Sequence, residues 1–274
     1  MKKLRDLTNE EELEVFNQRE NGESRKKIID SCGISERHYK DIVIKFGGSM
    51  KNMGGPKYNF NEDYFEKIDT EDKAYFLGFI VADGCISSKF NRISIIQKET
   101  DILYEFKRYI KSEGNIFTSN ARNISSFTIS SNKTKNDLQK LGVYSNKTMV
   151  VKYPDIPENL QSHFMRGVFD GDGCISLRTD KRDNQQRGQF NICSGSYDFI
   201  KEYYDRLVNY CKLSGKNKIR CPKGTYYVVD WGGLSDIENI YSFLYKDANV
   251  FLNRKKETFD RVVNITFNKI KYRK

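Results

Sequence analysis

The chain repeats one pentapeptide, first as Asp83-Gly84-Cys85-Ile86-Ser87 and again as Asp172-Gly173-Cys174-Ile175-Ser176. In both copies a glycine stands five residues before the aspartate, at Gly78 and at Gly167, so the two copies are in register. A repeat that extends beyond the shared motif indicates that one structural unit occurs twice in this chain.

The segments before the two pentapeptides read as buried helices. Residues 74–82 are apolar at every position, which favours a helix buried on all sides, and the segment is too short to span a membrane. Both segments place small residues four apart, Gly78 with Ala82 and Gly167 with Gly171. Because glycine inside a helix costs about 1 kcal/mol relative to alanine, this spacing predicts close approach of another backbone. The simplest partner of each helix is the other.

Such a helix pair would bring Asp83 and Asp172 together at one end. Two carboxylates about 4 Å apart repel by roughly 4 kcal/mol at an effective dielectric of about 20, so either one is protonated or a cation lies between them. Oxygen ligands favour Mg²⁺ or Mn²⁺. The alternative is that Asp-Gly merely ends a helix at a turn, but duplication in register favours a shared site.

The stretches Leu77–Gly84 and Arg166–Gly173 resemble the paired motifs of the LAGLIDADG homing endonucleases, and the resemblance runs from about Ala74 to the C-terminus. Both copies end in a small residue followed by Asp-Gly. The departure is Val81, where the family has an acidic residue that the second copy keeps as Asp170.

The resemblance implies the site residues. Metal-binding roles fall on the two aspartates and on the backbone carbonyls before them, and further catalytic roles fall on two lysines and one glutamine, whose counterpart in the second half is Ser194. The implied catalytic residues are Asp83, Asp172, Lys147, Lys255 and Gln97, and the implied ligands of Mg²⁺, for which Mn²⁺ can substitute, are Asp83, Asp172, Ala82 and Gly171.

Apolar and polar residues alternate after each motif in a way that predicts two strand pairs separated by a helix. We therefore expect an α+β fold in which two pseudo-symmetric αββαββα halves form a saddle of antiparallel sheets, preceded by a small three-helix domain. In the second half the expected strands are residues 174–178, 189–193, 218–221 and 226–230. The expected domains are a helix-turn-helix at 1–48, a linker at 49–60, a first half at 61–157 and a second half at 158–274.

The N-terminal region predicts three helices, at residues 8–22, 24–31 and 35–46, in which Thr8 and Glu11 form a capping box and Leu13 and Phe16 form the apolar side of the first helix. Residues 22–35 resemble the helix-turn-helix of resolvase and invertase DNA-binding domains. In that interpretation the third helix faces the major groove. The alternative is a three-helix module that binds no DNA. The side chains expected to face DNA are Arg37, His38 and Lys40.

The net charge of +10, from 47 basic and 37 acidic residues, favours an anionic polymer as the partner. Residues 1–50 carry equal numbers of basic and acidic side chains, so the whole excess lies in the segment with the repeat. A twisted antiparallel sheet suits the major groove, and we expect double-stranded DNA on its open face. The basic residues expected there are Lys89, Arg92, Arg122, Arg178, Arg182, Arg187 and Arg220.

The sequence argues against several other classes. Six cysteines without Cys-x-x-Cys spacing and only two histidines make a structural zinc site improbable. A calcium loop at residues 170–175 is excluded because Cys174 and Ile175 occupy positions that need an oxygen ligand and glycine. The first residues carry no apolar run, so we expect no signal peptide, no membrane partner and a cytoplasmic location in a bacterial or phage-infected cell.

Taken together, the resemblance implies a homing endonuclease that cuts both strands of DNA and leaves short 3′ overhangs. Because the two halves differ in sequence and lie in one chain, we expect a long, asymmetric target and a monomeric enzyme. Two alternatives stay open. The same fold serves as an RNA maturase that assists group I intron splicing, with intron RNA as the partner, and as a noncatalytic DNA-binding regulator. The presence of both aspartates favours the enzyme over the regulator.

Overall fold

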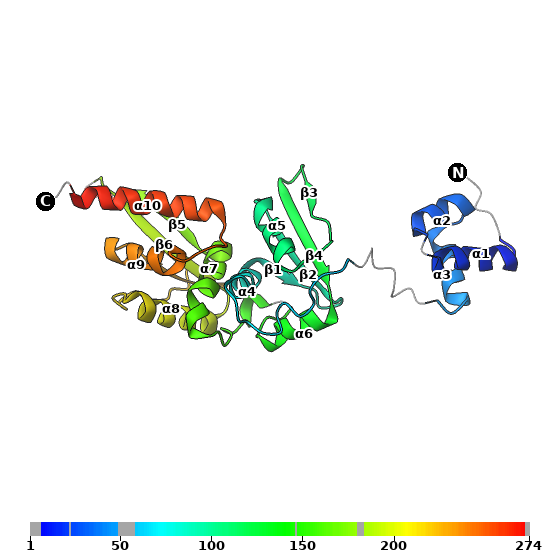
Figure 1. Ribbon diagram of the computed structural model, residues 1–274, viewed down its shortest axis with the longest axis horizontal. Helices are drawn as coiled ribbons and strands as arrows, with labels where there is room; N and C mark the ends of the chain where they lie inside the picture. The colour runs from blue at the N-terminus through cyan, green and yellow to red at the C-terminus, as the bar shows by residue number, and fades with distance from the viewer. Residues whose placement is uncertain (1–6, 22, 49–57, 146, 180–183, 272–274) are drawn as a thin grey trace. The chain divides into compact units, whose positions relative to one another are not determined.

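The computed structural model describes residues 7–271 except 22, 49–57, 146 and 180–183. The chain divides into two compact units, Met1–Lys57 and Tyr58–Lys274 (Figure 1). Most of the expected linker, at 49–57, lies outside the described residues, as does Arg182. In the described part of the chain, no helix combines the length and apolar character needed to cross a lipid bilayer.

The first unit contains three helices: α1 (Asn9–Glu20), α2 (Arg25–Cys32) and α3 (Glu36–Lys45). Thr8 and Glu11 form the predicted capping box, and Ser24 and Ser35 cap the next two helices through their hydroxyls. Gly33 ends α2 with φ of 66°, a left-handed conformation that glycine adopts at little cost. The three predicted helices are therefore confirmed to within two residues.

The apolar side of α1 differs from the prediction. Leu13 is 44% exposed, whereas Val15 is buried and Phe16 packs partly buried against the small core of this unit. The reason is geometric, since only one stripe of this short helix faces α2 and α3. The other buried residues of this core are Ile28, Ile34, Tyr39, Ile42 and Val43.

The second unit has an α+β fold, as predicted. Its first half follows the order α4 (Glu71–Asp83), β1 (Gly84–Ile86), β2 (Arg92–Gln97), α5 (Thr100–Tyr109), β3 (Phe117–Ser119), β4 (Ile124–Ser130) and α6 (Asn132–Lys140). The strands form one antiparallel sheet in the order β1-β2-β4-β3. This half has the predicted αββαββα order.

The second half departs from that order. Two short 3-10 turns, η2 (Lys147–Met149) and η3 (Glu158–Leu160), lead to α7 (Gln161–Asp172), β5 (Cys174–Thr179), β6 (Gln186–Ser194), α8 (Tyr197–Cys211), β7 (Tyr227–Trp231), α9 (Leu234–Tyr245) and α10 (Asn253–Lys271). The described strands form a three-stranded sheet in the order β5-β6-β7. The predicted strand at 218–221 is wrong.

That segment makes only an isolated bridge, between Arg220 and Val228. Pro222, two residues after Arg220, has no N–H to continue the hydrogen bonds of a strand. Gly215 and Gly224, on either side of the segment, have positive φ values of 63° and 69°, which are not strand conformations. The chain therefore meets the sheet at one point and turns away from it.

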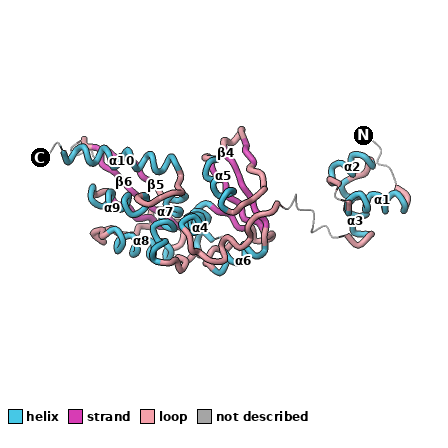
Figure 2. The backbone as a smooth tube through the Cα atoms, in the orientation of Figure 1, coloured by secondary structure: helices cyan, strands magenta, loops and turns pink. Residues whose placement is uncertain are grey.

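Helices α4 and α7 pack side by side between the two sheets (Figures 1 and 2). A Cβ atom at Gly78 would overlap the carbonyl oxygen of Phe164, and one at Gly167 would overlap the carbonyl oxygen of Tyr75. The backbones thus touch at two points related by the internal repeat. Residues 74–81 are all buried, which confirms the expectation of a helix buried on all sides.

Each sheet has one covered and one open face. Helix α5 contacts β2 and β4, whereas α8 contacts β6 and β7 and α10 contacts β5 and β6. Burial alternates along the strands accordingly, with Ile93 and Ile95 buried in β2 and Phe190 and Ile192 buried in β6. The intervening side chains form the open faces.

Replacing Gly78 or Gly167 with alanine tests the close approach of α4 and α7. Each added methyl group meets backbone that cannot move independently, so we expect a loss of about 1–3 kcal/mol in the free energy of urea unfolding despite the better helix propensity of alanine.

Gly232→Ala is the matched control, because a Cβ atom there would meet only the Gly188 carbonyl oxygen, at an ordinary 3.5 Å. Its unfolding free energy should stay within about 0.5 kcal/mol of the parent. Equal stability of all three variants would show that the helices do not touch through backbone.

Candidate active site

The two aspartates of the repeat lie at the C-terminal ends of α4 and α7. A Cβ atom at Gly171 would overlap the Cβ of Ala82 and would lie 3.2 Å from Oδ2 of Asp83, so the end of α7 sits directly against the first aspartate. Asp83 also raises the pKa of Asp172. The structure therefore brings the two aspartates that were predicted as metal ligands into one site.

Two lysines close this site in the same way on both sides. Lys147, on η2, donates through Nζ to the carbonyl oxygens of Gly84 at 2.5 Å and Ala82 at 3.3 Å. Lys255, on α10, donates to the carbonyl oxygen of Gly173 and, at 3.3 Å, to that of Phe169. Each lysine thus binds the glycine that follows its aspartate. The two predicted lysines reach the site from elements far apart in the sequence.

Burial dominates the electrostatics of the four charged groups. It raises the pKa of Asp172 to about 6, with Asp83 raising it further and the two lysines opposing the rise. Burial likewise raises the pKa of Asp83. It lowers the pKa values of Lys147 and Lys255, against the pull of the nearby carboxylates. Burial thus disfavours the charged form of all four groups.

The predicted glutamine contacts one aspartate directly. Gln97, the last residue of β2, donates through Nε2 to Oδ2 of Asp83 at 2.5 Å. Its register counterpart is Ser194, since Cys85 pairs with Ser94 in the first sheet and Cys174 pairs with Asn191 in the second. The Ser194 hydroxyl instead accepts from the N–H of Ser196 at 3.2 Å.

The two halves of the site therefore differ. Within the described residues, the Asp172 carboxylate accepts no hydrogen bond, although the carbonyl oxygen of the same residue accepts one from the Cys193 thiol at 3.4 Å. Asp83 is oriented by a side chain, whereas Asp172 is held by its helix alone.

The donor set fits a hard divalent cation. No cluster of three or more His, Cys, Asp or Glu side chains with metal-binding geometry occurs in the described parts of the chain, so a cage made by the protein alone is absent there. Mg²⁺ needs no such cage, because one or two carboxylates commonly hold it together with water and substrate phosphates. Asp83, which is half-buried, and Asp172, which is more exposed, both have raised pKa values, and carboxylates of this kind gain from such a cation.

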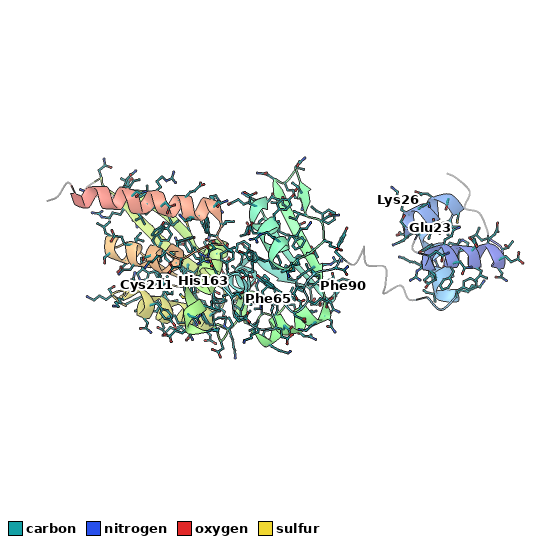
Figure 3. The ribbon with its side chains drawn as sticks, viewed as in Figure 1. Glu23, Lys26, Phe65, Phe90, His163 and Cys211 are labelled. Atoms are coloured by element: carbon teal, nitrogen blue, oxygen red, sulfur yellow. The ribbon has the colours of Figure 1, made fainter. Side chains whose placement is uncertain are left out.

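A buried polar network that the sequence did not suggest anchors α7. Arg166, 1% exposed, donates to the carbonyl oxygens of Val250 and Leu244, each at 2.9 Å, and to Glu71 at 2.8 Å. His163, which Figure 3 labels in the interior of the second unit, has its Nδ1 3.1 Å from Nη1 of Arg166. Asp170 accepts from Tyr75 at 2.8 Å, Tyr245 at 2.6 Å and the N–H of Leu252 at 2.7 Å. The one feature of the sequence that could have indicated this network is Arg166 itself, a charged residue at the position of the second motif where the first motif has Leu77.

The predicted DNA-binding residues of the second unit occupy exposed positions for the most part. Arg92 is exposed on β2, with its guanidinium 5.7 Å from the ring centre of exposed Phe90. Arg178 is exposed on β5 and lies opposite half-buried Arg187 on β6. Arg220 forms an ion pair with Asp230. Lys89 and Arg122 are exposed in the turns beside β2 and β4.

In the first unit, Arg37 and Lys40 are exposed on α3. His38 is half-buried, and its Nε2 lies 3.3 Å from Glu12, which also accepts from Lys45 at 2.5 Å. The α3 histidine therefore packs against α1, whereas its two basic neighbours point to solvent.

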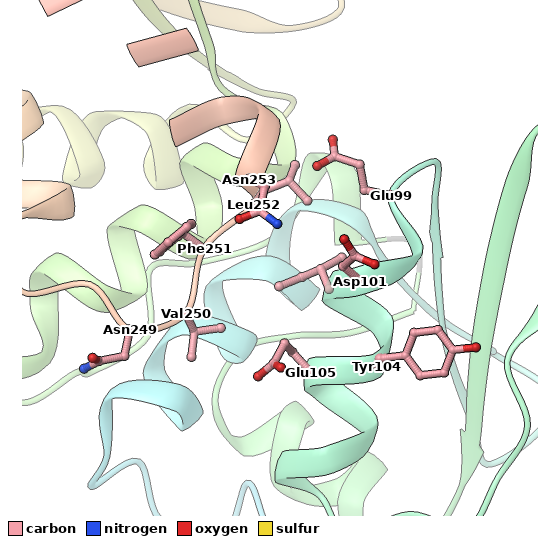
Figure 4. Close-up of a pocket in the computed structure, with 10 residues that line it drawn as sticks. Glu99, Asp101, Tyr104, Glu105, Asn249, Val250, Phe251, Leu252 and Asn253 are labelled. Carbon is pink, nitrogen blue, oxygen red and sulfur yellow. The ribbon is translucent and has the colours of Figure 1, made fainter. Parts of the chain in front are cut away.

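A separate cavity of about 390 Å³ lies between α5 and the connection from α9 to α10 (Figure 4). Glu99, Asp101 and Glu105 line it, and Glu99 pairs with Arg254 at 2.7 Å. Three carboxylates would repel phosphate, so this cavity is not part of a nucleic-acid surface.

Solved structures with a similar fold are LAGLIDADG homing endonucleases. No protein-family model matches the chain. I-GzeII in complex with its DNA target has a TM-score of 0.53 and 15% identity, over 72% of this chain and 91% of that one. I-LtrWI bound to target DNA has a TM-score of 0.51 and 15% identity, over 76% and 92%. I-SmaMI bound to uncleaved DNA in the presence of calcium ions has a TM-score of 0.50 and 16% identity, over 72% and 92%.

The second unit thus has the fold of the LAGLIDADG homing endonucleases. One curated relative, a probable translation initiation factor IF-2 of Methanocaldococcus jannaschii, is 23% identical over 267 residues, which cover 90% of this chain. The chain spans about a fifth of that protein, 21% of its length.

The raised pKa of Asp172 predicts a pH-dependent stability in the absence of divalent cations. Between its usual pKa of 3.8 and about 6, the folded state holds a proton that the unfolded state has released, so stability falls as the pH rises through this window. Asp172→Asn should remove at most about 1 kcal/mol of the loss between pH 5 and pH 8, because solvent screens the exposed part of this carboxylate; the measurement is urea unfolding in a chelator.

Asp155→Asn, at an exposed carboxylate, serves as the control and should keep the pH dependence of the parent. An Asp172→Asn protein with that same pH dependence would mean that Asp172 is not held in a charge-disfavouring site.

Proposed function

We propose that this chain is a site-specific DNA endonuclease of the homing type, which cuts both strands of a long, asymmetric target and leaves short 3′ overhangs. One observation carries the proposal. Asp83 and Asp172 end two helices in backbone contact, and each is accompanied by a lysine, half-buried Lys147 or buried Lys255, that donates to the carbonyl oxygen of the glycine after the aspartate. A nuclease that cuts two strands needs one set of charged groups for each strand, whereas a noncatalytic regulator needs neither set.

Asp83 and Asp172 would hold divalent cations, Mg²⁺ or in its place Mn²⁺, with help from the backbone carbonyls of Ala82 and Gly171. When bound, the cation supplies water activation and charge stabilisation at the scissile phosphates. The Ala82 carbonyl oxygen also accepts a hydrogen bond from Lys147, so this lysine would lie beside the cation at that oxygen.

Three side chains would act on the phosphates together with the cation. Gln97 fixes the orientation of the Asp83 carboxylate and, at its position beside it, can order water near a phosphate. Lys147 and Lys255 place ammonium groups in a low-dielectric site, where their attraction for negative charge developing on phosphate oxygens is stronger than in water. We propose these three residues as catalytic.

The open faces of the two sheets would lie along the major groove on either side of the cut, with double-stranded DNA as the substrate. The halves differ in sequence and share one chain, so a monomer would suffice for an asymmetric target. Arg37 and Lys40 on α3 would add phosphate or base contacts beyond the main target.

Asp83→Asn and Asp172→Asn test the shared site. Each change removes one anionic ligand while keeping the shape of the side chain, so folding and DNA affinity should change little. We expect either variant to lose at least about 100-fold in the rate of double-strand cleavage with Mg²⁺, which corresponds to about 3 kcal/mol of transition-state stabilisation. The assay follows supercoiled, nicked and linear DNA, after targets have been recovered by cleaving a randomised duplex library and sequencing the new ends.

Asp155→Asn should cleave at the parental rate. A parent that cuts DNA, together with an Asp83→Asn variant that cuts both strands equally fast, would place the active site elsewhere.

Removing the first unit should weaken binding without changing the chemistry, because no proposed catalytic residue lies before Tyr58. A protein that begins at Tyr58 should cut the same phosphates, with a higher Kd and a shorter footprint on DNA. Circular dichroism would establish that the fold is kept. Loss of cleavage at saturating concentrations of this folded protein would show that the first unit contributes to catalysis.

A further inference from the structure

The open face of the sheet β1-β2-β4-β3 carries an apolar row. Ile96 on β2 pairs with Ser126 on β4, which in turn pairs with Phe117 on β3, so the three side chains lie in line across the strands. Ile96 is 50% exposed and Phe117 is 65% exposed. In the neighbouring row the hydroxyls of Ser94 and Thr128 are 2.9 Å apart and share one hydrogen bond. This face therefore offers apolar side chains beside a pair of hydroxyls.

The open face of the sheet β5-β6-β7 has a different chemistry. Its cross-strand pairs include Ser176 with Gln189 and Arg178 with Arg187, and Asn191 pairs with Cys174. By register, the residue that corresponds to Ile96 is Cys193, which is half-buried and donates to the backbone of Asp172. The corresponding row holds Cys193, half-buried Val228 and Arg220, and the neighbouring rows of this face carry amide and guanidinium groups.

These groups match different edges of the major groove. Thymine presents a 5-methyl group that only an apolar side chain can use, whereas arginine pairs with guanine O6 and N7 and asparagine or glutamine pairs with adenine N6 and N7. Ile96 and Phe117 are separated by two strand spacings, about 10 Å, which is about three base-pair steps. Two thymines within one half-site can therefore meet this row.

Duplex DNA is the occupant that the charges favour. On the same strand as Ile96, Arg92 is exposed two rows away, and Arg122 is exposed in the turn between β3 and β4. A chain with a net charge of +10 presents these cations to a polyanion, and isolated apolar side chains among them suit a groove lined by methyl groups better than another cationic copy of the chain.

We propose that the two sheets read chemically different half-sites: the sheet β1-β2-β4-β3 reads thymine methyl groups through Ile96 and Phe117, and the sheet β5-β6-β7 reads purines through Arg178, Gln189 and Asn191. This inference rests on the proposed function and specifies its substrate. The target would then have one half-site whose thymines contact Ile96 and Phe117, and a second half-site whose guanine and adenine contact Arg178, Gln189 and Asn191.

Replacing thymine with uracil tests the inference, because it removes the methyl group and keeps every hydrogen-bonding atom. Targets recovered from the randomised library would be synthesised with uracil at single positions. The parent protein should bind the substituted duplex about fourfold more weakly per contacted methyl group, in one half-site only. In Ile96→Ser and Phe117→Ser proteins, each with an unchanged circular dichroism spectrum, the thymine and uracil duplexes should bind equally at the matching position.

Two controls test whether a loss of the preference for thymine is specific to Ile96 and Phe117. Tyr104→Ser removes an equally exposed apolar side chain, 58% exposed on α5 rather than on the sheet, and should keep the preference for thymine. Arg178→Ala should relax selection at guanine in the other half-site and leave the uracil effect intact.

Several outcomes would overturn the inference. Equal affinity for thymine and uracil at every position of a cleaved target would do so while leaving the nuclease proposal standing. So would sedimentation that shows a dimer lost in Ile96→Ser with the thymine preference unchanged. If no duplex is cut with Mg²⁺, the nuclease proposal itself fails. Duplexes recovered by binding would then be compared with thymine and with uracil, and this comparison alone would show whether Ile96 and Phe117 contact thymine methyl groups.

Discussion

The backbone contact between α4 and α7 is the constraint on which the rest of the structure depends. Gly78 and Gly167 let each helix reach the main chain of the other, and neither position has room for a Cβ atom. Because this contact lies at the centre of the second unit, one continuous hydrophobic core extends through both halves. The same contact places Asp83 and Asp172 together, so packing and chemistry have a common geometric origin.

The internal repeat is symmetric in its packing and asymmetric in its polar groups. Tyr75 on α4 donates to Asp170 on α7. In the internal repeat, the position equivalent to Tyr75 is Phe164 on α7 and the position equivalent to Asp170 is Val81 on α4, so the second such pair has neither a donor nor an acceptor. The donor and the buried acceptor are present together on one side and absent together on the other, which avoids an unpaired buried group. A buried polar group is tolerated only with its partner, and this explains why a valine can replace the acidic residue of the first motif.

Low identity and a shared fold are compatible here for physical reasons. The helix pair needs small residues at its contact points and carboxylates at its ends, while the covered faces of the sheets need apolar residues of any suitable shape. The open faces have no such requirement, because their side chains contact solvent in the free protein. The residues that we propose for recognition, Ile96, Phe117 and Arg178, can therefore vary while the fold remains similar to that of I-GzeII and I-LtrWI.

The sequence by itself determined the elements whose signals are local or repeated: the capped helices of the first unit, the buried helix at 74–82 and the pairing implied by Gly78 and Gly167. It missed the loss of a strand at 218–221, where Pro222 and two left-handed glycines override an alternating pattern. Only the tertiary structure decided that Lys147 and Lys255 bind equivalent carbonyls, because each comes from an element distant in sequence. The same holds for the network around Arg166 and Asp170, since a buried hydrogen bond is a property of neighbours that periodicity does not encode.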